Sequence, residues 1–279
     1  MMWHFNNYSI IDCHVHACHL TDRASLVFPE IGIPEILCES GHIVRLHDVQ
    51  GDTYTYVCST CGRIVYSGKD PHRIYNEEII EARKENELVF PFVAISPQIK
   101  RDMLYYAKKF GSRGVKLHPN YSSYIIDSCE VPTGFYYVIH SGKGEYDNPM
   151  RIFDFARQCQ GAVIIAHLGR MNKDLFDGIK ETNNIVLECS PVTGLWNAFK
   201  NKTGQIYDAS FLGEVETPEE MLQRVMEYVG IEKVVYGSDI PIKSASEDLA
   251  VVEKLPIVFK KKILFENIVS FLSTNNLVL

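Results

Sequence analysis

The fold is decided by the stretch Val163-Ile164-Ile165-Ala166-His167 and by two similar stretches, Val138-Ile139-His140 before it and Ile185-Val186-Leu187-Glu188-Cys189 after it. Each is a continuous apolar run, which is typical of a strand buried on both faces of a parallel sheet. Steps of 22 to 27 residues separate His118, His140, His167 and Cys189, and each step fits one strand-plus-helix unit. The repetition predicts an α/β fold, a (β/α)8 TIM barrel. An open doubly wound sheet is the alternative, but such a sheet binds its ligand at one switch point, whereas the functional residues here stand at the ends of several strands.

The flanking sequence continues the alternation of strands and helices. We expect strands at 88–96, 113–118, 135–140, 162–167, 185–189 and 233–237, and helices at 98–110, 150–160, 175–182, 217–229 and 263–273. Thr217-Pro218-Glu219-Glu220 predicts a helix start, because threonine caps well, proline suits the first helical position and a glutamate can complete a capping box. The second barrel strand is expected at 24–28, with 64–66 as the alternative.

Composition limits the class of protein. A chain of 279 residues, 46% of them apolar, can bury one large core. The net charge of −7 disfavours nucleic acid as a partner. No apolar stretch approaches the roughly 20 residues of a membrane span, and the first residues do not have the pattern of a secretory signal. Eight cysteines in a core-rich chain are expected to be reduced, so we expect a cytoplasmic protein. The expected partner is a small-molecule substrate. Homo-oligomerisation is left open.

Histidines and an aspartate stand at the C-terminal ends of four apolar runs. His14 and His16 are two residues apart and therefore point to the same face of a strand. His140, His167 and Asp239 each end another run. The C-terminal ends of barrel strands meet at one face, where active sites lie. Imidazole and carboxylate donors together suit Zn²⁺, with Mn²⁺ or Fe²⁺ as alternatives, so the sequence predicts a divalent metal at the barrel mouth.

Five segments resemble the amidohydrolase superfamily. They are Ile10-Ile-Asp-Cys-His-Val-His16, Gly114-Val-Lys-Leu-His-Pro119, Val138-Ile-His-Ser141, Ala166-His-Leu-Gly169 and Tyr236-Gly-Ser-Asp-Ile-Pro241. They are most similar to the amidohydrolase-related branch that contains aminocarboxymuconate-semialdehyde-decarboxylase-like proteins. The resemblance covers residues 8–28 and 70–272. It is specific for the superfamily and for metal-dependent chemistry, but weak for the substrate.

The resemblance implies that His14, His16, His140 and Asp239 hold one metal ion, and that His167 either joins them or acts on the substrate. The enzyme would be a metal-dependent hydrolase, in which a metal-activated water attacks an amide, lactone or ester-like carbonyl. Asp239 would take a proton from that water while His167 polarises the carbonyl. A non-oxidative decarboxylase (a C–C lyase) of the same superfamily is the alternative, acting on a carboxylate-bearing substrate. A non-catalytic metal-binding interaction protein is a minor alternative.

Four further residues are candidate substrate contacts. Lys116 and His118 lie on one face of the strand at 113–118, and the resemblance favours a single metal over a pair bridged by the lysine. Arg170 and Trp196 follow two later strands, where a cation would suit an anionic carboxylate. Asp12 is expected to orient a ligand imidazole or to end its strand.

Residues 30–69 interrupt the strand–helix rhythm, and we predict a small zinc-ribbon-like insertion there, within one barrel domain that spans 1–279. Cys38, His42, Cys58 and Cys61 have the spacing of a structural zinc site, with His47 as an alternative to His42. Alternating residues at 53–57 and 63–66 predict a hairpin that such a second Zn²⁺ would stabilise. A redox or disulfide pair at Cys58 and Cys61 is an alternative. The insertion is expected to act as a lid or an oligomer contact.

Overall fold

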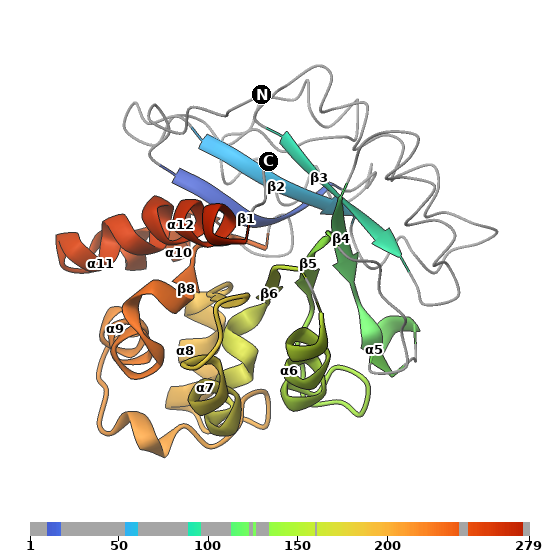
Figure 1. Ribbon diagram of the computed structural model, residues 1–279. Coiled ribbons are helices and arrows are strands. Elements are labelled where there is room, and N and C mark those ends of the chain that lie inside the picture. Colours follow the sequence, from blue (N-terminus) through green and yellow to red (C-terminus); the bar gives the residue numbers. More distant parts are fainter. Residues whose placement is uncertain are drawn as a thin grey trace, which may run out of the picture.

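The computed structural model describes residues 10–17, 54–60, 89–95, 113–122, 125–126, 134–159, 161–239 and 245–275. Eight parallel strands form one sheet in chain order (Figure 1). They are β1 (Ile10–Ala17), β2 (Tyr54–Thr60), β3 (Val89–Ile95), β4 (Gly114–Leu117), β5 (Tyr136–Ile139), β6 (Val163–Ile165), β7 (Ile185–Glu188) and β8 (Val234–Val235).

Backbone hydrogen bonds join the two ends of this strand order. The Cys13 N–H donates to the Tyr236 carbonyl at 3.0 Å, and the Asp239 N–H donates to the His14 carbonyl at 2.8 Å. Strand β1 therefore lies beside the residues that follow β8. This α/β arrangement, with its parallel sheet, is consistent with the TIM barrel predicted from the sequence.

Helices connect the strands and cover the sheet. They are α5 (Pro119–Ser122), α6 (Pro149–Gln158), α7 (Lys173–Ile179), α8 (Val192–Lys200), α9 (Pro218–Val229), α10 (Ala245–Glu253), α11 (Ile257–Lys261) and α12 (Asn267–Thr274), with the short turns η6 (His167–Met171), η7 (Ser210–Leu212), η8 (Ile231–Lys233) and η9 (Lys262–Glu266). Helices α6 to α9 lie together below the strands in Figure 1, and α12 lies near β1 and β8. Among the described residues, no helix combines the length and the apolar character that a membrane span needs.

Alternate residues of the strands enter two different apolar clusters. Ile139, Ile165 and Leu187 are fully buried and pack with residues of α6 to α9. Val138, Ile164 and Val186, one position earlier on the same strands, instead join a second cluster, which includes Ile11, Phe92 and Val235 from other strands and Ile268, Phe271 and Leu272 from α12. Because the side chains of a strand alternate between its faces, continuous apolar runs supply both clusters. Burial of each such side chain stabilises the fold by roughly 1.5–3 kcal/mol.

The second strand lies at 54–60, so the expected positions at 24–28 and 64–66 are wrong. Tyr54 on β2 is paired with Ile10 on β1, and Tyr56 is paired with Val89 on β3, both in parallel. A strand with a neighbour on each edge has no free edge for a hairpin partner, so the hairpin assignment of residues 53–57 is also wrong. An alternating polar–apolar pattern fits a barrel strand as well as it fits a hairpin arm, and the sequence does not distinguish them.

The predicted zinc ligands of the insertion lie outside the described residues. Cys38, His42 and Cys61 are not described, and of Cys58, on β2, only the backbone is described. The structural zinc site therefore stays a prediction.

The start of α9 confirms the helix signal at Thr217. The Thr217 side chain accepts a hydrogen bond from the Glu220 N–H at 3.2 Å, and Pro218 occupies the first helical position. The expected capping box is not formed in full. In a capping box the Glu220 carboxylate would accept from the Thr217 N–H, but here it accepts from the Glu216 N–H at 3.0 Å.

Candidate metal centre

His14 lies on β1 with its ring almost fully buried (1% exposed). Its Nδ1 lies 2.8 Å from Oε2 of Glu188, and its Nε2 lies 2.5 Å from Nζ of Lys116 and 3.5 Å from Oδ1 of Asp239. The ring thus has a carboxylate at each nitrogen, one from β7 and one from the segment after β8. Parallel strands bring together residues that are more than a hundred positions apart in the chain.

Asp12 holds the backbone of the histidine segment. Its Oδ1 accepts from the His14 N–H at 3.2 Å and from the Ser238 N–H at 3.0 Å, so one buried carboxyl group ties β1 to the residues after β8. Burial raises the pKa of Asp12 to about 8. These contacts position peptide groups, whereas the sequence predicted that Asp12 orients a ligand imidazole or ends its strand; β1 continues past it to Ala17.

His167 begins an unusual left-handed turn after β6. All five residues from His167 to Met171 have φ between 49° and 60°, which costs roughly 1–2 kcal/mol for each residue other than glycine. Asp239 has φ 57° as well. Strained backbone of this kind is concentrated at functional sites, and here it occurs at three of the residues that the sequence selected, His167, Arg170 and Asp239.

His140 and His167 form a pair. His167 Nδ1 donates to the Ser190 carbonyl at 2.8 Å, and its Nε2 lies 3.0 Å from Nδ1 of His140. The His118 ring stacks on His140 with the ring centroids 4.5 Å apart. Burial lowers the pKa of His167 to about 4 and that of His140 well below its ordinary value. Both rings are therefore neutral at pH 7, the form that binds metals.

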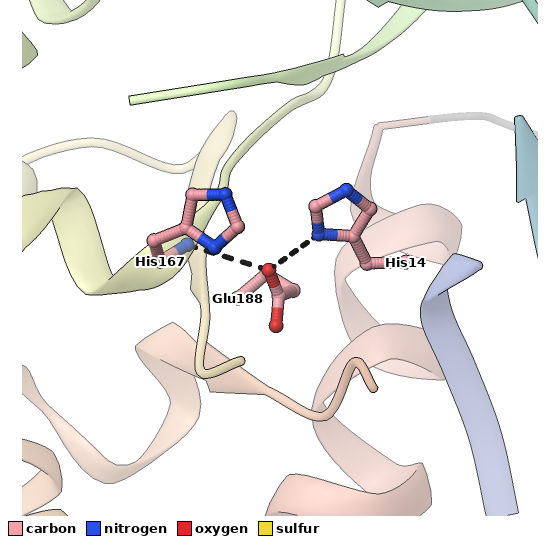
Figure 2. Close-up of side chains that lie close together, drawn as sticks. All are labelled: His14, His167 and Glu188. Carbon is pink, nitrogen blue, oxygen red and sulfur yellow. Dashed lines mark hydrogen bonds and ion pairs between the residues drawn. The ribbon is translucent and has the colours of Figure 1, made fainter. Parts of the chain in front are cut away.

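Glu188, at the end of β7, belongs to the centre although sequence reasoning missed it. The side chain is completely buried. Figure 2 shows its carboxylate between the rings of His14 and His167. Nitrogen and oxygen atoms of these three residues lie within 4.8 Å of one another and could hold a metal ion. A signal was present: like the histidines of the earlier runs, this glutamate directly follows the apolar residues Ile185–Leu187.

The structure brings most of the predicted site residues to this centre. Asp239 and Lys116 contact His14, His140 contacts His167, and His118 stacks on His140. Of His16 only the backbone, on β1, is described. In the described part of the chain, the ring contacts of Trp196 on α8 are with Phe199 and Lys200, not with the histidines.

Arg170 and Asp147 form the outer part of the centre. The Arg170 Nε donates to the Ser141 carbonyl at 2.9 Å, next to His140. Burial lowers the pKa of Arg170, although Asp147, Asp239 and Glu188 act in the opposite direction. Asp147 Oδ2 lies 3.9 Å from His140 Nε2, and its other oxygen accepts from the Gly144 N–H. Burial raises the pKa of Asp147.

A cavity of about 790 Å³ is lined by Lys143 and by residues between 198 and 216. Tyr207 on its wall donates its N–H to the Arg170 carbonyl at 2.9 Å, and the residues of the metal centre are not among the described ones that line the cavity. The Lys143 ammonium donates to the Ile206 carbonyl at 3.0 Å and lies 4.9 Å from the centre of the Tyr207 ring.

The sequence profile of a family described as Amidohydrolase matches residues 11–268. The chain belongs to the amidohydrolase family. The resemblance inferred from the motifs is thereby confirmed, and with it the expectation of an amidohydrolase-superfamily enzyme. A search of curated protein sequences found no match.

Solved structures of similar fold include both decarboxylases and a hydrolase. A dihydroxybenzoic acid decarboxylase from Polaromonas sp. JS666, with bound manganese and 2-nitroresorcinol, is 13% identical with TM-score 0.58, over 96% of this chain and 98% of that chain. The 5-carboxyvanillate decarboxylase of Sphingomonas paucimobilis is 12% identical with TM-score 0.57, over 94% and 98%. A proposed 2-pyrone-4,6-dicarboxylic acid hydrolase from Pseudomonas putida is 13% identical with TM-score 0.57, over 95% and 97%. At these identities the likeness concerns the fold.

Proposed function

We propose that this amidohydrolase is a metal-dependent hydrolase of a small carboxylate-bearing molecule. The proposal rests on one observation: His14 on β1, Glu188 on β7, and His167 and Asp239 in the segments after β6 and β8 converge on a buried centre. The proposed metal ligands are His14, His16, His140 and Asp239, together with His167. Neutral imidazoles and carboxylates fit a divalent ion, with Zn²⁺ expected and Mn²⁺ or Fe²⁺ as alternatives.

When bound, the metal supplies a Lewis acid that can lower the pKa of water to roughly 7. Asp239 is the proposed proton acceptor, because its Oδ1 lies 3.5 Å from His14 Nε2, next to the atom offered to the metal. A single metal is favoured here, with Lys116 contributing an ammonium group to His14 instead of bridging two ions.

His167 is better suited to bind the metal than to polarise a carbonyl. Its Nδ1 must carry a proton, because the Ser190 carbonyl can only accept a hydrogen bond. With the pKa lowered to about 4, the ring is neutral and Nε2 has no proton to donate. The Nε2 lone pair, which faces His140 Nδ1 at 3.0 Å, is then the one that His167 would offer to a metal.

Arg170 is the proposed receptor for the substrate carboxylate. Its Nε is fixed on the Ser141 carbonyl, and in the described part of the chain no carboxylate lies within ion-pair distance of its guanidinium. A guanidinium held in this way is suited to bind a carboxylate through two parallel hydrogen bonds. The cavity of about 790 Å³ that Tyr207 helps to line has a volume typical of small-molecule sites, and Tyr207 is hydrogen-bonded to the Arg170 carbonyl.

Metal removal and substitution of ligands test this function. We expect that chelation abolishes activity, that added metal restores it, and that His14→Ala and Asp239→Ala lower both metal content and turnover to background. Asp248→Asn, which changes a buried carboxylate outside the centre, is the matched control and should keep its metal. Full turnover by either ligand variant would refute the assignment.

Decarboxylation is the second candidate, and the fold similarity to two decarboxylases of aromatic acids supports it. The two reactions give different products. Incubation with hydroxylated benzoic acids would release carbon dioxide from a decarboxylase, whereas a hydrolase would open lactones or cleave amides without gas release. Whichever substrate set is turned over decides between them.

A second, structural Zn²⁺ held by Cys38, His42, Cys58 and Cys61 is also proposed, on the spacing of these residues alone. Elemental analysis should then find two metals per chain, one of which is lost when Cys58 and Cys61 are replaced by serine. Unchanged metal content in that double variant would remove the site.

A further inference from the structure

Glu188 is the buried group at which the elements of the centre meet. Its Oε2 lies 2.8 Å from His14 Nδ1 and accepts from the His167 N–H at 3.3 Å, while its Oε1 accepts from the Ser190 N–H. We propose that Glu188 is a positioning residue that fixes the protonation pattern of His14, so that Nε2 is the atom offered to the metal. The inference rests on the proposed metal-dependent function.

Two of the three contacts of Glu188 are with peptide N–H groups, which can only donate. An ionised carboxylate only accepts, so a charged Glu188 satisfies both of them and requires a donor at its third partner, His14 Nδ1. His14 must then carry its proton on Nδ1. Its Nε2 is left with a lone pair, which is consistent with the Lys116 ammonium 2.5 Å away as a donor. A carboxylate behind a metal-binding imidazole fixes both the ring orientation and the tautomer.

Gly237 makes room for this carboxylate. A Cβ atom at position 237 would lie 2.6 Å from Cγ and Oε1 of Glu188 and 2.7 Å from its Cδ. Any larger residue would therefore displace the glutamate. Because Gly237 is two residues before Asp239, the segment that carries one proposed ligand packs directly on the residue that orients another.

The same contacts argue against Glu188 as a metal ligand itself. Each of its oxygens already accepts from at least one N–H group, and Oε2 accepts from two. Ligation through Oε2, the oxygen nearest to His14, would require it to give up one of its two hydrogen bonds. A role behind the ligand leaves all of these bonds intact.

Glu188→Gln is the sharpest substitution, because it keeps the shape and replaces one acceptor with an NH₂ donor. In one amide orientation the NH₂ faces His14 Nδ1, which must then become an acceptor, and Nε2 becomes protonated. In the other orientation the NH₂ faces the Ser190 N–H, and two donors oppose each other. In the first orientation the NH₂ also opposes the His167 N–H, which donates to the same position, so neither orientation satisfies all three contacts and the variant cannot restore the native pattern.

Two measurements test the proposal. Nitrogen-15 NMR of the imidazoles in the metal-free protein should show His14 protonated on Nδ1, and should show that proton moved or shared in Glu188→Gln. Titration of the metal-free protein with Zn²⁺ or Mn²⁺ should show affinity lowered about 10- to 100-fold in Glu188→Gln. Asp248→Asn, another buried carboxylate that accepts backbone N–H groups, should bind within about 2-fold of wild type.

The outcomes separate this inference from the proposed function. Wild-type protein that binds no metal would refute the function, while the NMR result on metal-free protein still decides the role of Glu188. A His14 ring protonated on Nε2 in the wild type, or a Glu188→Gln variant that binds metal as tightly as wild type, would overturn the inference.

A second pair of variants serves if Glu188→Gln does not fold. Gly237→Ala should displace the carboxylate and weaken metal binding. Gly204→Ala, at a position where an added Cβ meets nothing within 4 Å, should not. Equal metal affinity in these two variants would count against the proposal.

Discussion

Asp248 on α10 provides a quantitative test of how a buried charge affects this fold. The side chain is fully buried. Its Oδ2 accepts from the Val192 N–H at 3.0 Å, and its Oδ1 accepts from the N–H and the hydroxyl of Thr193, both at 3.0 Å. These N–H groups belong to the first residues of α8 and have no partner within their own helix. The Asp248 carboxylate therefore caps a helix that begins about 55 residues earlier in the chain.

The capping contacts do not fully offset the burial of the charge. Burial raises the pKa of Asp248 from 3.8 to about 6, although the bonds to Thr193 and Val192 act in the opposite direction. A difference of roughly 2 pKa units corresponds to about 3 kcal/mol. Because the folded pKa is the higher one, the folded state binds more protons between about pH 4 and pH 6, and stability falls as the pH rises through that window.

The Asp248→Asn variant has no carboxyl group to titrate at this position. The difference in unfolding free energy between wild type and variant therefore isolates the contribution of Asp248. We expect the wild-type advantage in unfolding free energy to shrink by about 3 kcal/mol between about pH 4 and pH 7. Urea denaturation of both proteins across this range measures the difference, and the other titrating groups cancel. A difference that stays constant within about 0.5 kcal/mol would show that the helix N–H groups compensate the burial completely, and would refute the reasoning.

Three further predictions concern the centre and the surface. Gly142→Ala should lower the free energy of unfolding by about 1–3 kcal/mol in urea denaturation, because its Cβ would meet the Asp147 carboxylate. Gly204→Ala adds a Cβ in open space and should leave that free energy unchanged, so equal effects of the two substitutions would contradict the prediction. Arg170→Lys should raise KM about 10-fold or more with less change in kcat, and an unchanged KM would remove its proposed role. Asp177→Asn breaks exposed ion pairs and should cost less than about 1 kcal/mol, with the loss smaller at high salt.

The sequence by itself determined the parallel strands and the residues at their ends. Continuous apolar runs such as 163–165 indicate burial on both faces, and this property is local to the run. The start of α9 was equally readable, because Thr217 and Pro218 act within one turn of helix. The histidines His14, His140 and His167 could be expected to meet, since the C-terminal ends of barrel strands converge.

Only the tertiary structure decided the position of the second strand and the role of Glu188. Whether the alternating residues 54–60 pair with a hairpin partner or with β1 and β3 depends on neighbours remote in the chain. The carboxylate that orients His14 lies 174 positions away, on β7. A pattern along the chain records which residues are apolar, whereas strand partners and the protonated nitrogen of an imidazole depend on atoms that only folding brings into contact.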